Sequence, residues 1–260
     1  MDVLAHNRQA WDRNVERRNR WTLPVDGETI NKARRGEFSL VLTPTKPVPA
    51  DWFPALPGLP TLCLASGGGQ QGPLLAAAGA VVTVFDNSPG QLAQDRFVAE
   101  REGLQITTVQ GDMRDLSVFA DGTFGLIVHP CSNCFVPEIL PVWRECYRVL
   151  RAGGVLITGF TNPLRYLFDG DRMESGALVV SHSIPYSDIK DLSEADRQRL
   201  IVDDMQPLEF SHTLAEQIGG QLAAGFLLSG FFEDRYEASV GDPISLRIDT
   251  FIATRAVRIG

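Results

Sequence analysis

Five short apolar runs alternate with segments of helical periodicity between residues 61 and 160. Each run is too short for a buried helix and is apolar at successive positions, as in strands buried on both faces. Strands linked by helices predict a parallel sheet with right-handed crossovers. We therefore expect an α/β fold with a doubly wound, Rossmann-like sheet. The runs are 61–65, 80–85, 106–110, 124–128 and 155–160.

The rest of the chain departs from this rhythm. A helix pattern at 213–224 precedes two apolar runs, 226–232 and 246–253, with no helix pattern between them. These two runs predict an antiparallel pair at one edge of an otherwise mostly parallel sheet. Residues 161–210 are charged and poorly periodic, and they interrupt the alternation after the fifth run.

The first 60 residues predict a helical N-terminal arm that ends in a proline-rich linker at 43–60. Proline removes a backbone donor and fixes φ, so the linker is neither a helix nor a central strand. We expect Trp52 and Phe53 to attach it to the core. The expected organisation is an arm and linker at 1–60, followed by a domain at 61–260 with a lid-like insert at 161–210.

Local signals place several helix ends. Ser88 is an expected N-cap, with Pro89 at the first helical position and Gln91 placed for a capping box. That helix is expected to end at Gly103. Further helices are predicted to begin at Pro73 and to span 142–150.

A glycine-rich loop lies between the first strand and the first of these helices. Gly67, Gly69 and Gly72 satisfy G-x-G-x-x-G, and Asp86 follows Gly67 by 19 residues, at the end of the second strand. Glycines allow close approach of a ligand, and a carboxylate at this position accepts from ribose hydroxyls. The pair predicts an adenosine-containing cofactor. The alternative is a glycine-rich turn with an aspartate that caps a helix.

The order of motifs resembles that of the class I S-adenosylmethionine-dependent methyltransferases, especially the bacterial type 11 methyltransferase domains. The resemblance covers 61–160 well and 225–256 loosely. The matching segments are 62–69, 81–86 followed by Asn87-Ser88-Pro89, 110–113, 124–129 and 148–154.

This resemblance implies that S-adenosyl-L-methionine is the cofactor. Its methionine part would lie along the backbone of Ala65, Ser66, Gly67 and Gly69. Asp86 would hold the ribose, Asn87 would pack against the adenine, Asp112 would accept from the adenine amino group, and the Met113 backbone would lie beside the ring. Related proteins often carry an acidic residue where this chain has Cys63. Contact with the cofactor's ammonium group is then expected from carbonyls at Ala65 or His129.

Methyl transfer depends mainly on holding the acceptor, methyl group and sulfur in line. A general base is needed only for an acceptor that is still protonated. His129 and Asn133 are the weak candidates for a catalytic role. The insert at 161–210 is expected to cover the acceptor, and the candidate acceptor-binding residues are Trp11, Trp21, Ser132, Asn133, Tyr166 and His182.

Two short motifs suggest other chemistry. Pro130-Cys131 with Cys134 is half of a zinc deaminase signature, but no His-x-Glu occurs in the chain, so no metal is expected. Tyr186 and Lys190 fit the Tyr-x-x-x-Lys of short-chain dehydrogenases and leave an NAD(P)-dependent oxidoreductase as an alternative. A catalytically silent cofactor-binding scaffold is the second alternative.

Charge and composition limit the partners. The 260 residues carry a net charge of −8, which opposes binding to nucleic acid. An excess of basic residues before Gly36 is interpreted as the solvated face of a helix rather than a phosphate-binding arm. No apolar stretch approaches 18 residues, so no membrane partner is expected. We interpret the four cysteines as reduced thiols, which predicts a cytoplasmic protein. The acceptor is expected to be a small molecule.

Overall fold

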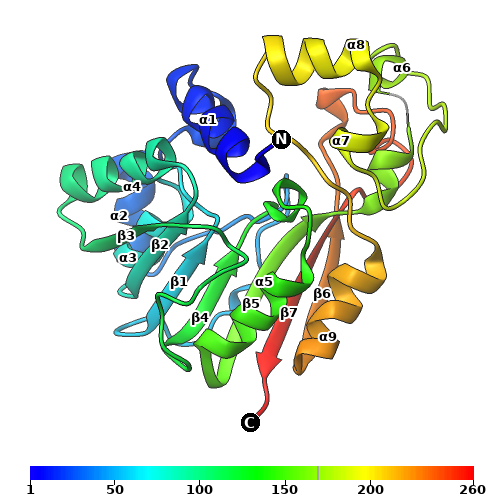
Figure 1. The fold of residues 1–260 in the computed structure, drawn as a ribbon. Coiled ribbons are helices and arrows are strands. Elements are labelled where there is room, and N and C mark those ends of the chain that lie inside the picture. The colour runs from blue at the N-terminus through cyan, green and yellow to red at the C-terminus, as the bar shows by residue number, and fades with distance from the viewer. Residues whose placement is uncertain (169) are drawn as a thin grey trace.

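A seven-stranded sheet forms the centre of the computed structural model, which describes residues 1–168 and 170–260. The strand order is β3-β2-β1-β4-β5-β7-β6, and the first five of these strands are parallel (Figure 1). This is the predicted α/β, doubly wound architecture. The strands are β1 Pro60–Leu64, β2 Val81–Asp86, β3 Ile106–Gln110, β4 Phe124–His129, β5 Leu150–Thr161, β6 Phe226–Asp234 and β7 Phe251–Arg258.

The predicted antiparallel pair is present at one edge of the sheet. β7 runs antiparallel to both β5 and β6, with Ile157 opposite Arg255. The expected range 246–253 for this strand was wrong by several residues. Leu246 and Ile248 are exposed, so their apolar character does not mark a buried strand. β7 begins only at Phe251.

Helices cover both faces of the sheet and enclose two hydrophobic cores. On one face α3 (Gln71–Ala77) and α4 (Pro89–Glu102) contribute Leu75 and Leu92. On the other, α5 (Leu140–Val149) contributes Trp143, and α9 (Gly220–Ala224) packs against α5. Successive residues of the central strands β1 and β4 enter alternate cores, which explains why these runs are apolar, whereas the edge strand β3 is only partly buried.

The local signals for α4 are largely confirmed. The Ser88 hydroxyl accepts from the Gln91 amide at 3.0 Å, Pro89 is the first helical residue, and Gly103 ends the helix at φ 65°. The capping box is only half formed, because the Ser88 amide donates to Asp86 and the side-chain Oε1 of Gln91 is buried without a hydrogen-bond partner in the described structure. α3 starts at Gln71, two residues before the expected Pro73.

The N-terminal arm packs on the sheet domain. In α1 (Val3–Glu16), Asp12 accepts from the Ser88 hydroxyl at 2.6 Å and from the Gly90 amide at 2.9 Å, at the N-terminus of α4. α2 (Gly27–Arg34) packs beside α3. The linker is attached as predicted: Trp52 is buried 5.4 Å from Phe232, and Phe53 packs against the same core.

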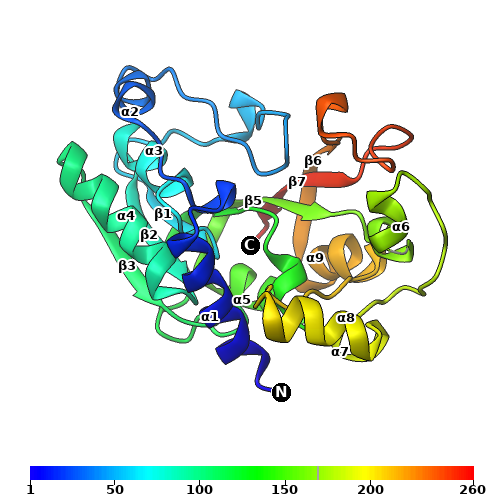
Figure 2. The same ribbon diagram turned by 90° about the horizontal axis from the view of Figure 1, so that it is seen from above.

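The arm and the insert meet above the carboxyl ends of the parallel strands (Figures 1 and 2). The buried Asn7 side chain donates to the carbonyls of Phe135 and Leu208 and accepts from the Leu208 amide at 2.7 Å. One side chain of α1 therefore binds both the loop after β4 and the end of the insert. The insert contains α6 Gly170–Glu174, α7 Asp188–Asp191, α8 Glu194–Asp196 and a π-helical segment, Arg197–Asp203.

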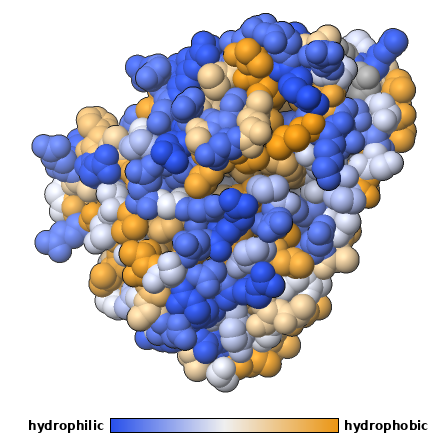
Figure 3. All heavy atoms as spheres, in the orientation of Figure 1, coloured by the Kyte–Doolittle hydropathy of each residue, from blue (hydrophilic) through white to orange (hydrophobic). Residues whose placement is uncertain are grey.

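The surface in the orientation of Figure 1 mixes hydrophilic and hydrophobic side chains (Figure 3). Small apolar groups stand among charged and polar residues, as is ordinary for globular proteins. Within the described residues, no helix has both the length and the apolar character needed to span a membrane.

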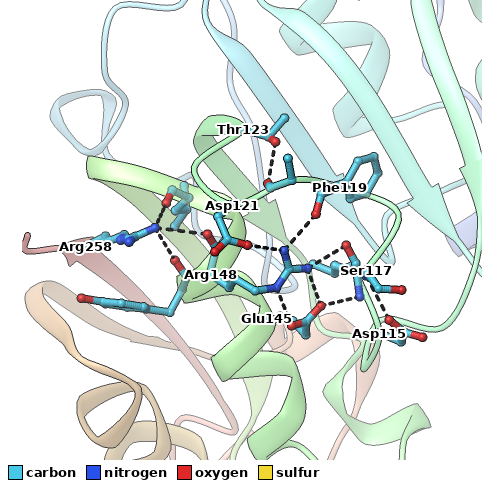
Figure 4. Close-up of polar contacts among 12 residues, drawn as sticks. Asp115, Ser117, Phe119, Asp121, Thr123, Glu145, Arg148 and Arg258 are labelled. Atoms are coloured by element: carbon cyan, nitrogen blue, oxygen red, sulfur yellow. Dashed lines mark hydrogen bonds and ion pairs between the residues drawn. The ribbon is translucent and has the colours of Figure 1, made fainter.

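Arg148, near the end of α5, fixes the loop that follows β3 (Figure 4). Its guanidinium donates to the carbonyls of Leu116 and Phe119, each at 2.9 Å, and pairs with Glu145 and Asp121 at 2.8 Å. Glu145 in turn accepts from the Leu116 amide at 2.7 Å. This network holds the chain just beyond Asp112 against the sheet domain.

Replacing Arg148 with alanine tests this network. Arg148→Ala is expected to lower the free energy of unfolding by about 1.5–3 kcal/mol, the range for hydrogen bonds that involve charged groups. Urea denaturation measures the change. The control is Arg144→Ala, an exposed position on the same helix, which should stay within about 0.5 kcal/mol of the wild type. Equal losses in the two variants would contradict the role given to Arg148.

Candidate cofactor and acceptor site

A cavity of about 790 Å³ lies at the carboxyl ends of the parallel strands. Its walls come from α1, the glycine loop, the ends of β2, β3 and β4, and the insert after β5. This is the place at which open α/β sheets bind ligands. The fold therefore brings together most of the residues that the sequence marked as a site.

Two acidic side chains accept hydrogen bonds from backbone amides of the glycine loop. The Gly67 amide donates to Asp86 at 2.9 Å, and the Gly68 amide donates to Asp95 at 3.0 Å. A side chain at Gly67 would collide with Gln91, because an added Cβ would lie 2.6 Å from the Gln91 Cβ. Ala65 adopts a positive φ of 46°, and its carbonyl accepts from the Ser132 hydroxyl at 2.7 Å.

Asp86 lines the cavity at the end of β2. It accepts from the amides of Gly67 and Ser88, both at 2.9 Å, and the structure gives it no arginine or lysine partner among the described residues. Burial raises the pKa of its carboxyl, and the amide donors oppose that rise. A partly buried carboxylate with spare acceptor capacity fits the two hydroxyl donors of a ribose.

Asp95 was missed by the sequence analysis. It lies on α4, completely buried, and burial raises the pKa of its carboxyl to about 8. One of its oxygens has no partner in the described structure. The available signal was an acidic residue on an apolar stripe, since Leu92, Asp95 and Val98 recur at helical spacing and all are buried.

The expected adenine-side residues also line the cavity. Asn87 donates to the Leu4 carbonyl at 2.9 Å, so the arm helps to position it. Asp112 is paired with Arg114, whose guanidinium lies 2.6 Å from one carboxylate oxygen. Met113 lies between them in the chain and lines the same wall. Ala65, Ser66 and Gly67 complete the expected cofactor side.

Three expected site residues do not reach the cavity. Gly69 lies behind the loop, where its carbonyl accepts from the Val25 amide at 3.0 Å. His129 is fully buried below the cavity, and its ring contacts the Leu64 carbonyl at 2.8 Å and the Asn133 side chain. Asn133 is buried as well and donates to Gln217 at 2.8 Å.

The structure places both catalytic candidates beneath the cavity. Burial lowers the pKa of His129, and its ring makes hydrogen bonds within the protein. Neither His129 nor Asn133 is among the residues that line the cavity. The polar sequence at the end of β4 therefore forms a hydrogen-bond network under the site.

The other acceptor-side candidates do line the cavity. Trp11 comes from α1 and packs edge-on against Phe135 at 5.1 Å. Trp21, Ser132, Tyr166 and His182 line it from the arm, the β4 loop and the insert. The sequence analysis missed Glu209 and Asp188, which also line it, because the irregular insert has no period that distinguishes inward from outward positions.

The structure places the cysteine pair and the Tyr-x-x-x-Lys pattern in different surroundings. Cys131 and Cys134 line the cavity, and burial raises the pKa of both thiols, which favours the neutral form. No group of three or more potential metal ligands occurs in 1–168 or 170–260. Tyr186 lines the cavity but donates its hydroxyl to Asp188 at 2.8 Å, whereas Lys190 is not among the lining residues. The Tyr-x-x-x-Lys pattern therefore does not form a catalytic pair.

The sheet order, the glycine loop and the carboxylate after β2 define an S-adenosylmethionine-dependent enzyme of the class I methyltransferase type. A family model described as a methyltransferase domain matches residues 62–158. The Bacillus subtilis (strain 168) protein named uncharacterized methyltransferase YbaJ is 52% identical over 257 residues, covering 99% of each chain. The chain belongs to this methyltransferase family, and its cofactor is S-adenosylmethionine.

More distant proteins share parts of the chain. A ubiquinone biosynthesis O-methyltransferase from Xanthomonas campestris pv. campestris (strain B100) is 29% identical over 42% of this chain and 45% of its own length. A crystal structure of an S-adenosylmethionine-dependent methyltransferase from Mesorhizobium loti has a TM-score of 0.61 at 17% identity, covering 80% of this chain and 94% of the other. The second likeness supports the fold alone.

The buried carboxyl of Asp95 predicts a pH dependence of stability. In the folded state it holds its proton up to about pH 8, whereas its ordinary pKa is 3.8. Folding therefore takes up a proton in this window, and the free energy of unfolding should fall as pH rises, by at most about 1.4 kcal/mol per unit. Asp95→Asn cannot titrate and should show a shallower decline between pH 5 and 8.

Urea denaturation at several pH values measures this slope. The matched control is Asp203→Asn, an exposed carboxylate on the insert, which should keep the wild-type slope. Identical slopes in the wild type and Asp95→Asn would show that Asp95 titrates normally.

Proposed function

We propose that this methyltransferase acts on a small-molecule acceptor by in-line methyl transfer. The enclosure of the site carries this proposal. One cavity of about 790 Å³ reaches from the glycine loop to the insert, within the range of about 300–1,000 Å³ typical of small-molecule sites. The cofactor and the acceptor must share this volume.

The residues present fit the cofactor. Asp86 offers acceptors for the ribose, Asn87 and Met113 flank the expected adenine position, and the backbone from Ala65 to Gly67 forms the adjoining wall. When bound, S-adenosylmethionine would supply a methyl group on positively charged sulfur, which is open to attack by a lone pair of the acceptor. The protein's part is to orient the acceptor, to remove its proton where one is present and to exclude water.

The arm and the insert provide this exclusion. Asn7 binds the β4 loop and Leu208, the His6 ring contacts the Gln206 carbonyl at 2.9 Å, and Arg17 donates to the Asp204 carbonyl at 3.1 Å. These contacts join the arm to the insert over the acceptor side of the cavity. We infer that residues 1–60 and 161–210 act together as a cover for the domain at 61–260.

The same features favour a small partner over nucleic acid. The net charge is −8, and carboxylates outnumber arginines among the described lining residues. A polyanion would be repelled by this charge. All four cysteines are free thiols, which supports a reducing, cytoplasmic location.

Loss of the Asp86 carboxylate should weaken cofactor binding. Asp86→Ala is expected to reduce the affinity for S-adenosylmethionine by about 1.5–3 kcal/mol, or roughly 10- to 150-fold, because charge-assisted hydrogen bonds to the ribose are lost. Isothermal titration calorimetry measures the dissociation constant. Asp51→Ala, an exposed carboxylate on the linker, is the control and should bind as the wild type does.

Titration of NAD and NADP in parallel tests the cofactor assignment. The expected result is micromolar binding of S-adenosylmethionine and S-adenosylhomocysteine and no binding of the nicotinamide nucleotides. An Asp86→Ala variant that is folded and binds S-adenosylmethionine with unchanged affinity would refute the ribose role.

A further inference from the structure

The acceptor end of the cavity has a chemistry of its own. We define the acceptor lobe as the lining residues Cys134, Tyr166, His182, Tyr186, Asp188 and Glu209. We propose that this lobe binds an amine as its ammonium and that Glu209 takes the proton that the nitrogen must lose before methylation. The inference rests on the proposed function and adds the class of acceptor.

Aromatic rings form one side of the lobe. Tyr166 stacks on Tyr186 with ring centroids 5.5 Å apart, and the His182 ring meets Tyr186 edge-on at 5.0 Å. The faces of aromatic rings attract ammonium groups, by about 0.5–2 kcal/mol according to exposure. An acceptor that carries a positively charged nitrogen is therefore stabilised here.

Two carboxylates form the polar side. Glu209 accepts from the Tyr166 hydroxyl at 2.7 Å, and Asp188 accepts from the Tyr186 hydroxyl at 2.8 Å. The Glu209 amide also donates to Asp188 at 2.6 Å, which ties the two residues together. The donors to these carboxylates are hydroxyl and amide groups, so their negative charge is not cancelled by the bonds that hold them.

The charge balance of the cavity also favours an amine over an anionic acceptor. Among the described lining residues, six are carboxylates and three are arginines. Each arginine is paired with an aspartate: Arg114 with Asp112, Arg165 with Asp242 and Arg199 with Asp196. An anionic acceptor would meet like charge in a partly buried site, whereas an amine would meet opposite charge.

Backbone hydrogen bonds next to Glu209 hold the acceptor lobe beside the loop after β4. The amide of Phe210 donates to the Cys134 carbonyl at 2.8 Å, and the amide of Ser211 donates to the Tyr186 carbonyl at 2.9 Å. These bonds join the end of the insert to the loop after β4, which also carries Ser132 beside Ala65. Glu209 is thus fixed on the wall that adjoins the glycine loop.

The proton balance of the transfer defines the role of Glu209. The amine binds as an ammonium, which first passes one proton to the ionised Glu209 carboxylate and so gains a lone pair on nitrogen. That lone pair forms the carbon–nitrogen bond as the carbon–sulfur bond breaks, and the methylated nitrogen again carries a positive charge. The product leaves as an ammonium, and Glu209 returns its proton to solvent, which restores the starting state.

The surroundings of Glu209 suit this transfer. Burial raises the pKa of the Glu209 carboxyl, Asp188 raises it further, and the Tyr166 hydrogen bond and the Arg165 charge oppose the rise. Cys134 also faces Tyr166, and its neutral thiol adds no charge. A carboxyl with a raised pKa is a better proton acceptor near neutral pH than an ordinary glutamate.

Binding of matched probes tests the inference. Phenethylamine, 2-phenylethanol and 3-phenylpropionate share a scaffold and differ in the charge of the head group. Calorimetry on the full chain, with and without S-adenosylhomocysteine, is expected to show phenethylamine binding at least tenfold more tightly than the other two. Equal affinities, or a preference for the alcohol or the carboxylate, would overturn the inference.

Two variants test whether Glu209 causes the preference for phenethylamine. Glu209→Gln keeps an acceptor for the Tyr166 hydroxyl and should remove most of the amine preference while binding of 2-phenylethanol stays within twofold. Asp203→Asn removes the same charge from an exposed site on the insert and should keep the full preference. A folded Glu209→Gln that still prefers the amine tenfold would exclude Glu209.

Tyr166→Phe tests the positioning role of Tyr166. Loss of its hydrogen bond should shift the pH profile of phenethylamine binding to higher pH, because that bond lowers the pKa of Glu209. An unchanged profile would contradict the coupling. Failure of S-adenosylhomocysteine to bind would overturn the proposed function, whereas loss of the amine preference alone would overturn only this inference.

Discussion

The glycine loop depends on carboxylates that lie on different elements. Asp86, at the end of β2, holds the Gly67 amide, and Asp95, on α4, holds the Gly68 amide. These bonds fix the backbone between β1 and α3, where we propose that the cofactor binds. Asp86 also faces the cavity, whereas Asp95 is fully buried and supports the loop alone.

The rest of the site is built around this loop. Asp12 of α1 binds the N-terminus of α4, and Asn7 joins α1 to the β4 loop and to the insert. Arg148 holds the loop after β3, which carries Asp112 and Met113. Segments far apart in the sequence therefore line one cavity, in which we propose a cofactor end at Asp86 and an acceptor end at Glu209.

The sequence predicted the sheet and the position of the glycine loop because both depend on local patterns. The apolar runs located β1 to β5, and glycine spacing together with Asp86 located the loop. The sequence-based prediction failed at residues whose burial does not follow from their polarity. Leu246 and Ile248 are apolar yet exposed, and His129 is polar yet buried beneath the site. The acceptor end was only partly predicted, because which residues of an irregular insert face inward depends on long-range contacts such as that between Phe210 and Cys134.

We propose that one cavity binds the cofactor at Asp86 and presents its reactive end to the acceptor lobe. The decisive experiment is a crystal structure of the complex with S-adenosylhomocysteine. We expect both ribose hydroxyls within hydrogen-bond distance of the Asp86 carboxylate and the sulfur directed toward Tyr166 and Glu209. A nucleoside bound away from Asp86, or a sulfur directed away from the insert, would contradict this arrangement.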